Sequence, residues 1–179
     1  GSPFAHDSRY LLKKVVQRCK SRGYVCKIGA ECEFYLFKTD ENGDPTDITL
    51  DGGGYLDISP LDKGENIRRE ICLNLEEMVI NPESSHHEQG PGQHEVDFRY
   101  SDALTAADNF LTFNSVVKAI AARNGLFASF MPKPLPHAAG SGLHVNISLA
   151  QNGLNIFKNV AGERRGAAES FIAGILART

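Results

Sequence analysis

Residues 24–37 alternate apolar and polar side chains, a period of two that is typical of β-strands, with a break expected near Gly29. The polar run 39–45 (TDENGDP) that follows has the composition of a hairpin turn. Strands joined by such short turns pair antiparallel. These features favour an α+β fold with an antiparallel sheet over a doubly wound parallel sheet.

Four stretches carry apolar residues at helical spacing and predict helices at 8–22, 63–80, 102–124 and through 168–176. Asp7 or Ser8 is placed to cap the first helix, and Gly23 is placed to end it. Residues 51–55 (DGGGY) predict a flexible loop. Further strands are expected at 95–100, 126–131 and 143–149, with a Pro/Gly-rich loop at 132–142.

The composition excludes some kinds of binding partner and indicates a cellular compartment. A formal net charge of -3 and a pI near 6.1 give no electrostatic basis for binding nucleic acid or an anionic membrane. The longest apolar runs are far shorter than a bilayer span. C-x-x-C spacing is absent among Cys19, Cys26, Cys32 and Cys72, which argues against a zinc knuckle. Because Cys26 and Cys32 match inward strand positions, we expect reduced thiols and a cytoplasmic protein.

Glu31 and Glu33 stand two residues apart in the strand-like run GAECEF. Side chains at i and i+2 share one strand face, about 6.6 Å apart. Two carboxylates at that separation repel each other unless a cation or solvent compensates. Taken alone, the run favours a solvated strand face over a metal site.

Residues 83–95 (ESSHHEQGPGQHE) concentrate charged and imidazole groups, and no apolar periodicity runs through 81–94. The segment is expected to be a loop that leads into the strand at 95–100. A solvated loop with incidental histidines is one interpretation. A metal-binding loop is the other, and its oxygen-rich ligands suit Mg²⁺ or Mn²⁺ better than Zn²⁺.

Residues 140–149 (GSGLHVNISL) alternate cleanly. Leu143, Val145, Ile147 and Leu149 are expected to face a core, and the opposite face would carry His144, Asn146 and Ser148. A structural histidine explains this segment equally well by itself. If all three segments converge on one sheet face, they assemble a carboxylate and histidine cluster of the kind that holds two metals against phosphate oxygens. Since no GxxxxGK[ST] or GxGxxG motif is present, a nucleotide would be held by metals and a sheet surface.

The motifs occur in the order found in glutamine synthetases: Glu31-Cys-Glu33-Phe34, His86-His87-Glu88 with Pro91-Gly92-Gln93 and Glu95, Met131-Pro-Lys-Pro134, and Gly140-Ser-Gly-Leu-His144. Across residues 1–179 the sequence resembles the N-terminal portion of the catalytic domain of the bacterial and archaeal type I enzymes. The resemblance implies the glutamine synthetase/guanido kinase-like fold, a curved antiparallel sheet with flanking helices.

The resemblance also implies a ligand set for two divalent ions, Mg²⁺ or Mn²⁺. Glu33, Glu88 and Glu95 would hold one ion, and Glu31 and His144 would hold the other. Gly140 would touch the glutamate substrate. Four further positions match those that line the nucleotide site: Glu83, Tyr100, Asn146 and Ser148.

The implied reaction has two steps. ATP phosphorylates the side-chain carboxylate of L-glutamate, and ammonia then displaces phosphate to give glutamine. The family forms homo-oligomeric, dodecamer-like rings with sites between subunits. A β-grasp-like domain and the substrate-gripping arginines of the family have no counterpart in residues 1–179, so we expect this polypeptide to be inactive alone.

Two positions depart from the family pattern, and other functions stay open. Ala139 stands where an Asn is usual, and Asn146 stands where many members have a second histidine. Ala139 leaves open a γ-glutamyl ligase that uses an amine or polyamine acceptor. A non-catalytic scaffold is disfavoured because all five implied metal ligands are present, and a phosphohydrolase is disfavoured because none of the clustered ligands is an aspartate.

Overall fold

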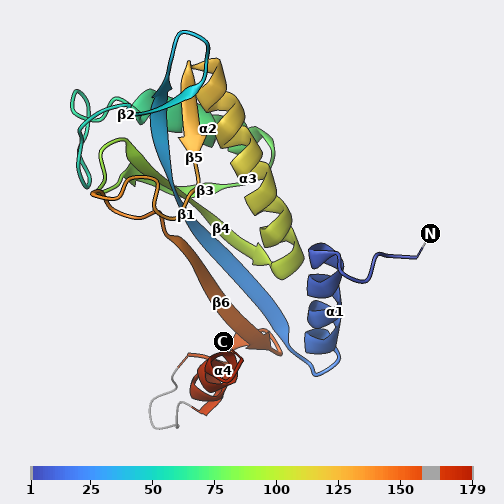
Figure 1. Cartoon of the computed structure of the whole chain (residues 1–179). Helices are drawn as coiled ribbons and strands as arrows, with labels where there is room; N and C mark the ends of the chain where they lie inside the picture. The colour runs from blue at the N-terminus through green and yellow to red at the C-terminus, as the bar shows by residue number, and fades with distance from the viewer. Residues whose placement is uncertain (1, 159–165, 179) are drawn as a thin grey trace. The chain divides into compact units, whose positions relative to one another are not determined.

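The computed structural model describes residues 2–158 and 166–178 (Figure 1). Within them the chain forms seven strands and four helices, which confirms the α+β class. In order these are α1 Ser8–Lys20, β1 Val25–Thr39, β2 Pro45–Thr49, α2 Glu65–Glu77, β3 Pro82–His87, β4 Gln93–Asp102, α3 Ala103–Arg123, β5 Leu126–Ser129, β6 Leu143–Gln151, β7 Leu154–Asn155 and α4 Gly166–Leu176.

One sheet contains all seven strands, in the order β3-β4-β1-β6-β7, with β2 and β5 also paired to β1. The pairs β1–β2, β1–β5, β3–β4 and β6–β7 are antiparallel. The predicted break near Gly29 is wrong, because β1 runs without interruption from Val25 to Thr39. A glycine weakens a strand, but here the neighbours β4 and β6 hold β1 extended on both sides.

The chain divides into two compact units, residues 29–100 with 108–145, and residues 1–28 with 101–107 and 146–179. The first of these units holds the hydrophobic core. One face of β1 packs against apolar residues of α2 and α3, and Phe34 contacts the Phe113 ring at a centroid distance of 6.2 Å. Burying each such side chain stabilises the fold by about 1.5–3 kcal/mol.

Period-two alternation then decides which residues of β1 face away from that core. Ala30, Cys32, Phe34 and Leu36 belong to the core cluster. Their neighbours Glu31 and Glu33 therefore point to the opposite face of the sheet. The sheet face that is not covered by α2 and α3 is thus the face that carries the paired carboxylates.

The second unit is built from chain segments at both ends of the sequence. Asp7 caps α1 by accepting a 2.9 Å hydrogen bond from the Tyr10 amide, as the sequence predicts. Lys27 and Asp102 form an ion pair at 3.1 Å.

None of the four cysteines is disulfide-bonded, and no helix in the described part of the chain has the length and apolar character required to cross a bilayer.

Two sequence expectations need correction. Residues 81–94 are not a loop throughout, since they contain β3 and the beginning of β4. The apolar period is missing because polar rings, His87 and His94, occupy the buried face of these strands. Leu143 and Val145 of β6 do not face a core, because about half of each is exposed and neither belongs to the core cluster.

Candidate metal centre

The candidate site is organised by the β3–β4 hairpin. Its cross-strand pairs include His86 opposite Glu95 and His87 opposite His94. Because successive side chains point to opposite faces, the first pair faces away from the core and the second faces toward it. The hairpin therefore presents His86 and Glu95 on the sheet face that also carries Glu31 and Glu33.

Two groups of potential ligands meet on this face, and Glu95 belongs to both. In one, ligand atoms of Glu31, Glu95 and His144 all lie within 4.8 Å of one another; in the other, so do those of His86, Glu88 and Glu95. His144 Nδ1 lies 3.1 Å from Glu31 Oε2. His86 Nε2 lies 2.8 Å from Glu88 Oε1 and 3.2 Å from Glu95 Oε2.

The electrostatics of the face are those of crowded carboxylates. Burial, followed by the charge of Asp97, the hydrogen bond and charge of Glu88, and the charge of Glu33, raises the pKa of Glu95 to about 8. Such a shift means that the negative charge of Glu95 is poorly compensated by the protein's own groups. The donor set of carboxylate oxygens with imidazole nitrogens fits a hard or borderline divalent cation such as Mg²⁺ or Mn²⁺.

Glu33 lies beside these groups and is held by the protein. Its Oε2 accepts a 2.7 Å hydrogen bond from Gln93 Nε2 and a 2.9 Å bond from the Gly142 amide. Gln93 Nε2 also donates to the Gly140 carbonyl at 2.9 Å. The predicted metal ligand Glu33 is thereby connected to the predicted substrate loop.

The loop 132–142 is fixed against the sheet by its backbone. Tyr35 donates a 2.6 Å hydrogen bond from its hydroxyl to the Ala139 carbonyl. The Ser141 amide donates to the Pro132 carbonyl at 2.9 Å. A Cβ at Gly140 would lie 2.8 Å from the Pro132 oxygen, so only glycine fits this close approach.

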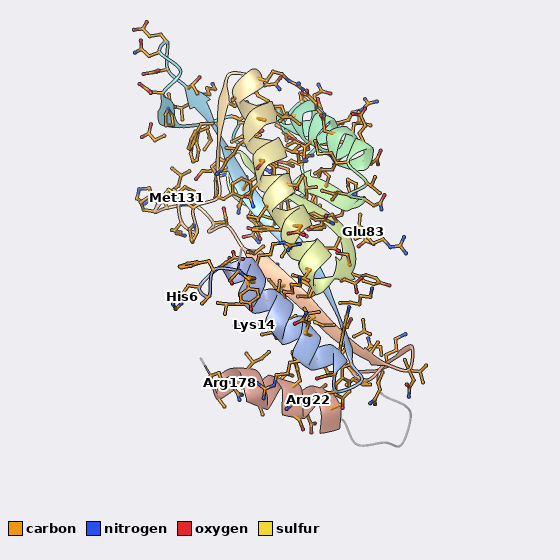
Figure 2. The ribbon with its side chains drawn as sticks, turned by 90° about the vertical axis from the view of Figure 1, so that its right-hand side faces the viewer. His6, Lys14, Arg22, Glu83, Met131 and Arg178 are labelled. Atoms are coloured by element: carbon orange, nitrogen blue, oxygen red, sulfur yellow. The ribbon has the colours of Figure 1, made fainter. Side chains whose placement is uncertain are left out.

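The four residues that are expected to line a nucleotide site do not form one group. Glu83 is exposed at an irregularity of β3, at the edge of the sheet (Figure 2). Tyr100 is exposed on β4, and neither residue belongs to the two ligand groups. Asn146 and Ser148 follow His144 along β6 but lie in the other compact unit.

Sequence reasoning missed His86 as a member of the site. Its ring lies between Glu88 and Glu95, and the ring of Tyr55 meets it edge to face at a centroid distance of 5.7 Å. The missing signal was strand register. Extending the alternation of β4 back from Glu95, and pairing it across a tight hairpin, would have placed His86 opposite Glu95.

Comparison with known proteins gives one consistent family. A family model described as the glutamine synthetase catalytic domain matches residues 5–179. The glutamine synthetase of Clostridium saccharobutylicum is 52% identical over 178 residues, which are 98% of this chain and 40% of that protein. The glutamine synthetase of Methanosarcina mazei is 50% identical over 157 residues, 88% of this chain and 35% of that protein.

Solved structures agree with the sequence relatives. A GmaS–ADP complex matches with a TM-score of 0.80 and 33% identity, over 90% of this chain and 38% of that one. The chain thus spans about 40% of the length of the C. saccharobutylicum relative. On the family match and the shared fold together, the chain belongs to the glutamine synthetase catalytic-domain family.

Proposed function

We propose that this chain supplies the metal-binding part of an ATP-dependent ligase that joins ammonia to L-glutamate through γ-glutamyl phosphate. The observation that carries the proposal is the position of Glu95, which lies in two ligand groups on one face of the sheet. A carboxylate shared by neighbouring groups suits a pair of divalent ions, which is the arrangement that phosphoryl transfer uses. Family membership supports the same chemistry.

The proposed ligand assignment follows the family motifs. Glu33, Glu88 and Glu95 would hold one ion, and Glu31 and His144 would hold the other, as Mg²⁺ or Mn²⁺. The contact of His144 with Glu31 supports the second set. The positions of Glu88 and Glu95 around His86 support the first set and add His86 as a group that orients both carboxylates.

The chemistry requires a negatively charged carboxylate to attack a negatively charged triphosphate. Divalent ions, when bound, offset that repulsion and stabilise transition-state charge. Attack of the glutamate side-chain oxygen on the γ-phosphorus releases ADP, and attack of ammonia on the acyl carbon then releases phosphate. Gln93 and Tyr35 would hold the loop containing Gly140 in place for the glutamate substrate.

The nucleotide and the assembly belong to the same proposal. Glu83, Tyr100, Asn146 and Ser148 would line the ATP site of the complete catalytic domain. The complete protein would form a homo-oligomeric ring. Ammonia is the proposed acceptor because both relatives described above are glutamine synthetases.

Calorimetric titration of the 179-residue chain with Mn²⁺ tests the metal site directly. We expect binding by the wild type and a loss of at least roughly tenfold in affinity for Glu95→Gln, which keeps the size but removes the charge. Glu77→Gln, an exposed position on α2, is the matched control and should bind as the wild type does. Equal affinities for all three proteins would contradict the proposed site.

A further inference from the structure

A buried polar network lies directly behind the candidate metal ligands, on the core face of the same hairpin. We call it the buried histidine network, and its members are Asp51, Asp62, Arg68, His87 and His94. Both histidine side chains are fully buried, and their rings meet edge to face at a centroid distance of 4.8 Å. Each histidine adjoins a proposed ligand in sequence, because His87 precedes Glu88 and His94 precedes Glu95.

His87 connects the backbone of a proposed ligand to a fixed carboxylate. Its Nδ1 lies 2.7 Å from the Glu88 carbonyl oxygen, and its Nε2 lies 2.9 Å from Asp51 Oδ1. Both partners are hydrogen-bond acceptors, so a ring N–H of His87 can donate to either of them. Asp51 is itself held by the amides of Gly53, Gly92 and Lys63 at 2.9–3.1 Å.

Arg68 anchors the second strand of the hairpin. Its guanidinium donates to both oxygens of Asp62, at 3.1 and 2.8 Å, and its NH1 donates to His94 Nδ1 at 2.8 Å. Its Nε donates to Ser85 Oγ at 3.0 Å, which ties α2 to β3. Since arginine only donates, His94 Nδ1 must accept, and its ring proton sits on Nε2.

A metal ion is a poor explanation for this cluster, although ligand atoms of Asp51, Asp62, His87 and His94 lie within 4.8 Å of one another. Arg68 already supplies the compensating positive charge and occupies both oxygens of Asp62. Asp51 already accepts hydrogen bonds on both of its oxygens. A cation would have to break these hydrogen bonds, although His94 Nε2 has no hydrogen-bond partner among the described residues.

We propose that the buried histidine network is a positioning device that sets the backbone of Glu88 and the hairpin register, so that the carboxylates on the opposite face hold a divalent ion. The inference rests on the proposed metal function. Its key contact is the hydrogen bond from His87 Nδ1 to the Glu88 carbonyl. Groups that orient metal ligands in this way change metal affinity without touching the ion.

Two amide substitutions at His87 separate positioning from stability. Asn carries its amide nitrogen three bonds from Cα, as Nδ1 does, so His87→Asn keeps a donor toward the Glu88 carbonyl. Gln carries its nitrogen four bonds from Cα, as Nε2 does, so His87→Gln keeps a donor toward Asp51. The positioning role predicts near wild-type Mn²⁺ affinity for His87→Asn and a loss of roughly 10- to 100-fold for His87→Gln.

A merely structural role predicts the opposite order. Asp51 is buried and carries charge, so the variant that keeps its donor, His87→Gln, should then be both the more stable and the better Mn²⁺ binder. Calorimetry with Mn²⁺ alone, and urea unfolding of each 179-residue variant, distinguish the two orders. Equal affinities for both variants and the wild type, or the reversed order, would overturn the proposal.

Hydrogen exchange supplies a readout that is independent of metal. The Glu88 amide donates to the Gln93 carbonyl at 2.8 Å across the hairpin. Positioning by His87 predicts faster exchange of this amide in His87→Gln than in His87→Asn. If the wild type binds no Mn²⁺, the proposed metal function fails, and this comparison alone decides the positioning role. Equal exchange in the two variants would then overturn it.

Two substitutions that keep the positive charge test the part of the network around Arg68. Arg68→Lys keeps the positive charge but loses the planar fork that joins Asp62 to His94. Arg69→Lys, at the exposed neighbouring position on α2, is the matched control. We expect Arg68→Lys alone to lower Mn²⁺ affinity, by roughly tenfold or more. Unchanged affinity in a folded Arg68→Lys chain would contradict the proposal.

Discussion

Gln93 on β4 donates from Nε2 to Oε2 of Glu33 on β1 across 2.7 Å, so one buried amide fixes the orientation of a proposed metal ligand. The same nitrogen donates to the Gly140 carbonyl, and the amide oxygen of Gln93 accepts from Gly90. The Gly142 amide also donates to Glu33 Oε2. Since both donors meet Oε2, Oε1 is the oxygen that we expect to face a cation.

Replacing Gln93 by Met keeps the side-chain length but removes all three hydrogen bonds. The half-buried Glu33, the exposed Gly140 and the buried Gly90 then each lose a hydrogen-bond partner, which should lower the free energy of unfolding by about 1–3 kcal/mol. Urea denaturation followed by circular dichroism measures this loss. Gln89→Met, at an exposed position of the same hairpin, should change it by less than about 0.5 kcal/mol. Similar losses for both variants would contradict the bridging role of Gln93.

Gly64 lies against the ring of His94, and a Cβ at this position would collide with ring atoms Cε1 and Nε2. Burial and the positive charge of Arg68 lower the pKa of His94 to about 3. The ring is fully buried and Arg68 NH1 contacts its Nδ1 at 2.8 Å, so the ring cannot move aside without breaking that hydrogen bond. Gly64→Ala should therefore lower the free energy of unfolding by about 1–3 kcal/mol. Thermal and urea unfolding measure the effect.

Gly52→Ala is the control for that substitution. A Cβ at Gly52 meets no atom within 4 Å, and its backbone conformation needs no glycine. The substitution should be neutral or slightly stabilising, because it restricts the unfolded chain. A Gly64→Ala chain as stable as Gly52→Ala would show that the buried ring accommodates the added methyl group.

Much of the fold could be predicted from local patterns. All four helices were expected close to their observed positions, because each carries a strong apolar period and α1 has its cap in Asp7. The hairpin after β1 was predicted by its turn composition. The strand β3 was missed because its buried position is filled by His87 rather than by an apolar residue.

Like the fold, the candidate site could be predicted only in part from the sequence. Period-two alternation was enough to place Glu31 and Glu33 on one face, and motif order brought in Glu88, Glu95 and His144. The sharing of Glu95 between two groups depends on strand order across β3, β4 and β1, which no local pattern encodes. Leu143, which is half exposed, was wrongly expected to face a core. Alternation predicts which side chains share a sheet face, but it does not predict whether another element covers that face.

Cys32 offers a test of the core that does not depend on function. It is 2% exposed, and burial, helped by the charges of Glu33, Glu95 and Asp97, raises its pKa to about 12. Because the thiolate is the reactive form, iodoacetamide at about pH 8 should leave Cys32 unmodified in the folded chain and modify it in urea. Peptide mass spectrometry should show faster reaction at Cys19, which is partly exposed on α1. Equal rates at the two positions would contradict the buried environment of Cys32.

The Asp51 carboxylate makes a prediction about acid stability. Burial alone would raise the pKa of Asp51, but hydrogen bonds from His87, Lys63, Gly53 and Gly92 outweigh it and leave the pKa below its ordinary value. A carboxyl whose folded pKa is depressed stabilises the fold above the unfolded pKa, about 3.9 for Asp. This stabilisation is lost as the pH falls through the folded pKa, because the proton then weakens its acceptor oxygens.

The wild-type urea midpoint should therefore fall between about pH 5 and pH 2.5, and Asp51→Asn should remove part of that fall, since it carries no titrating group. Asp51→Asn should also be the less stable protein at pH 5, because its amide nitrogen must face a backbone donor that the carboxylate accepted. Asp47→Asn, at an exposed position on β2, is the matched control and should keep the wild-type slope. If Asp51→Asn retained the full wild-type pH dependence, the hydrogen-bonded carboxylate would not be the group that links acid to unfolding.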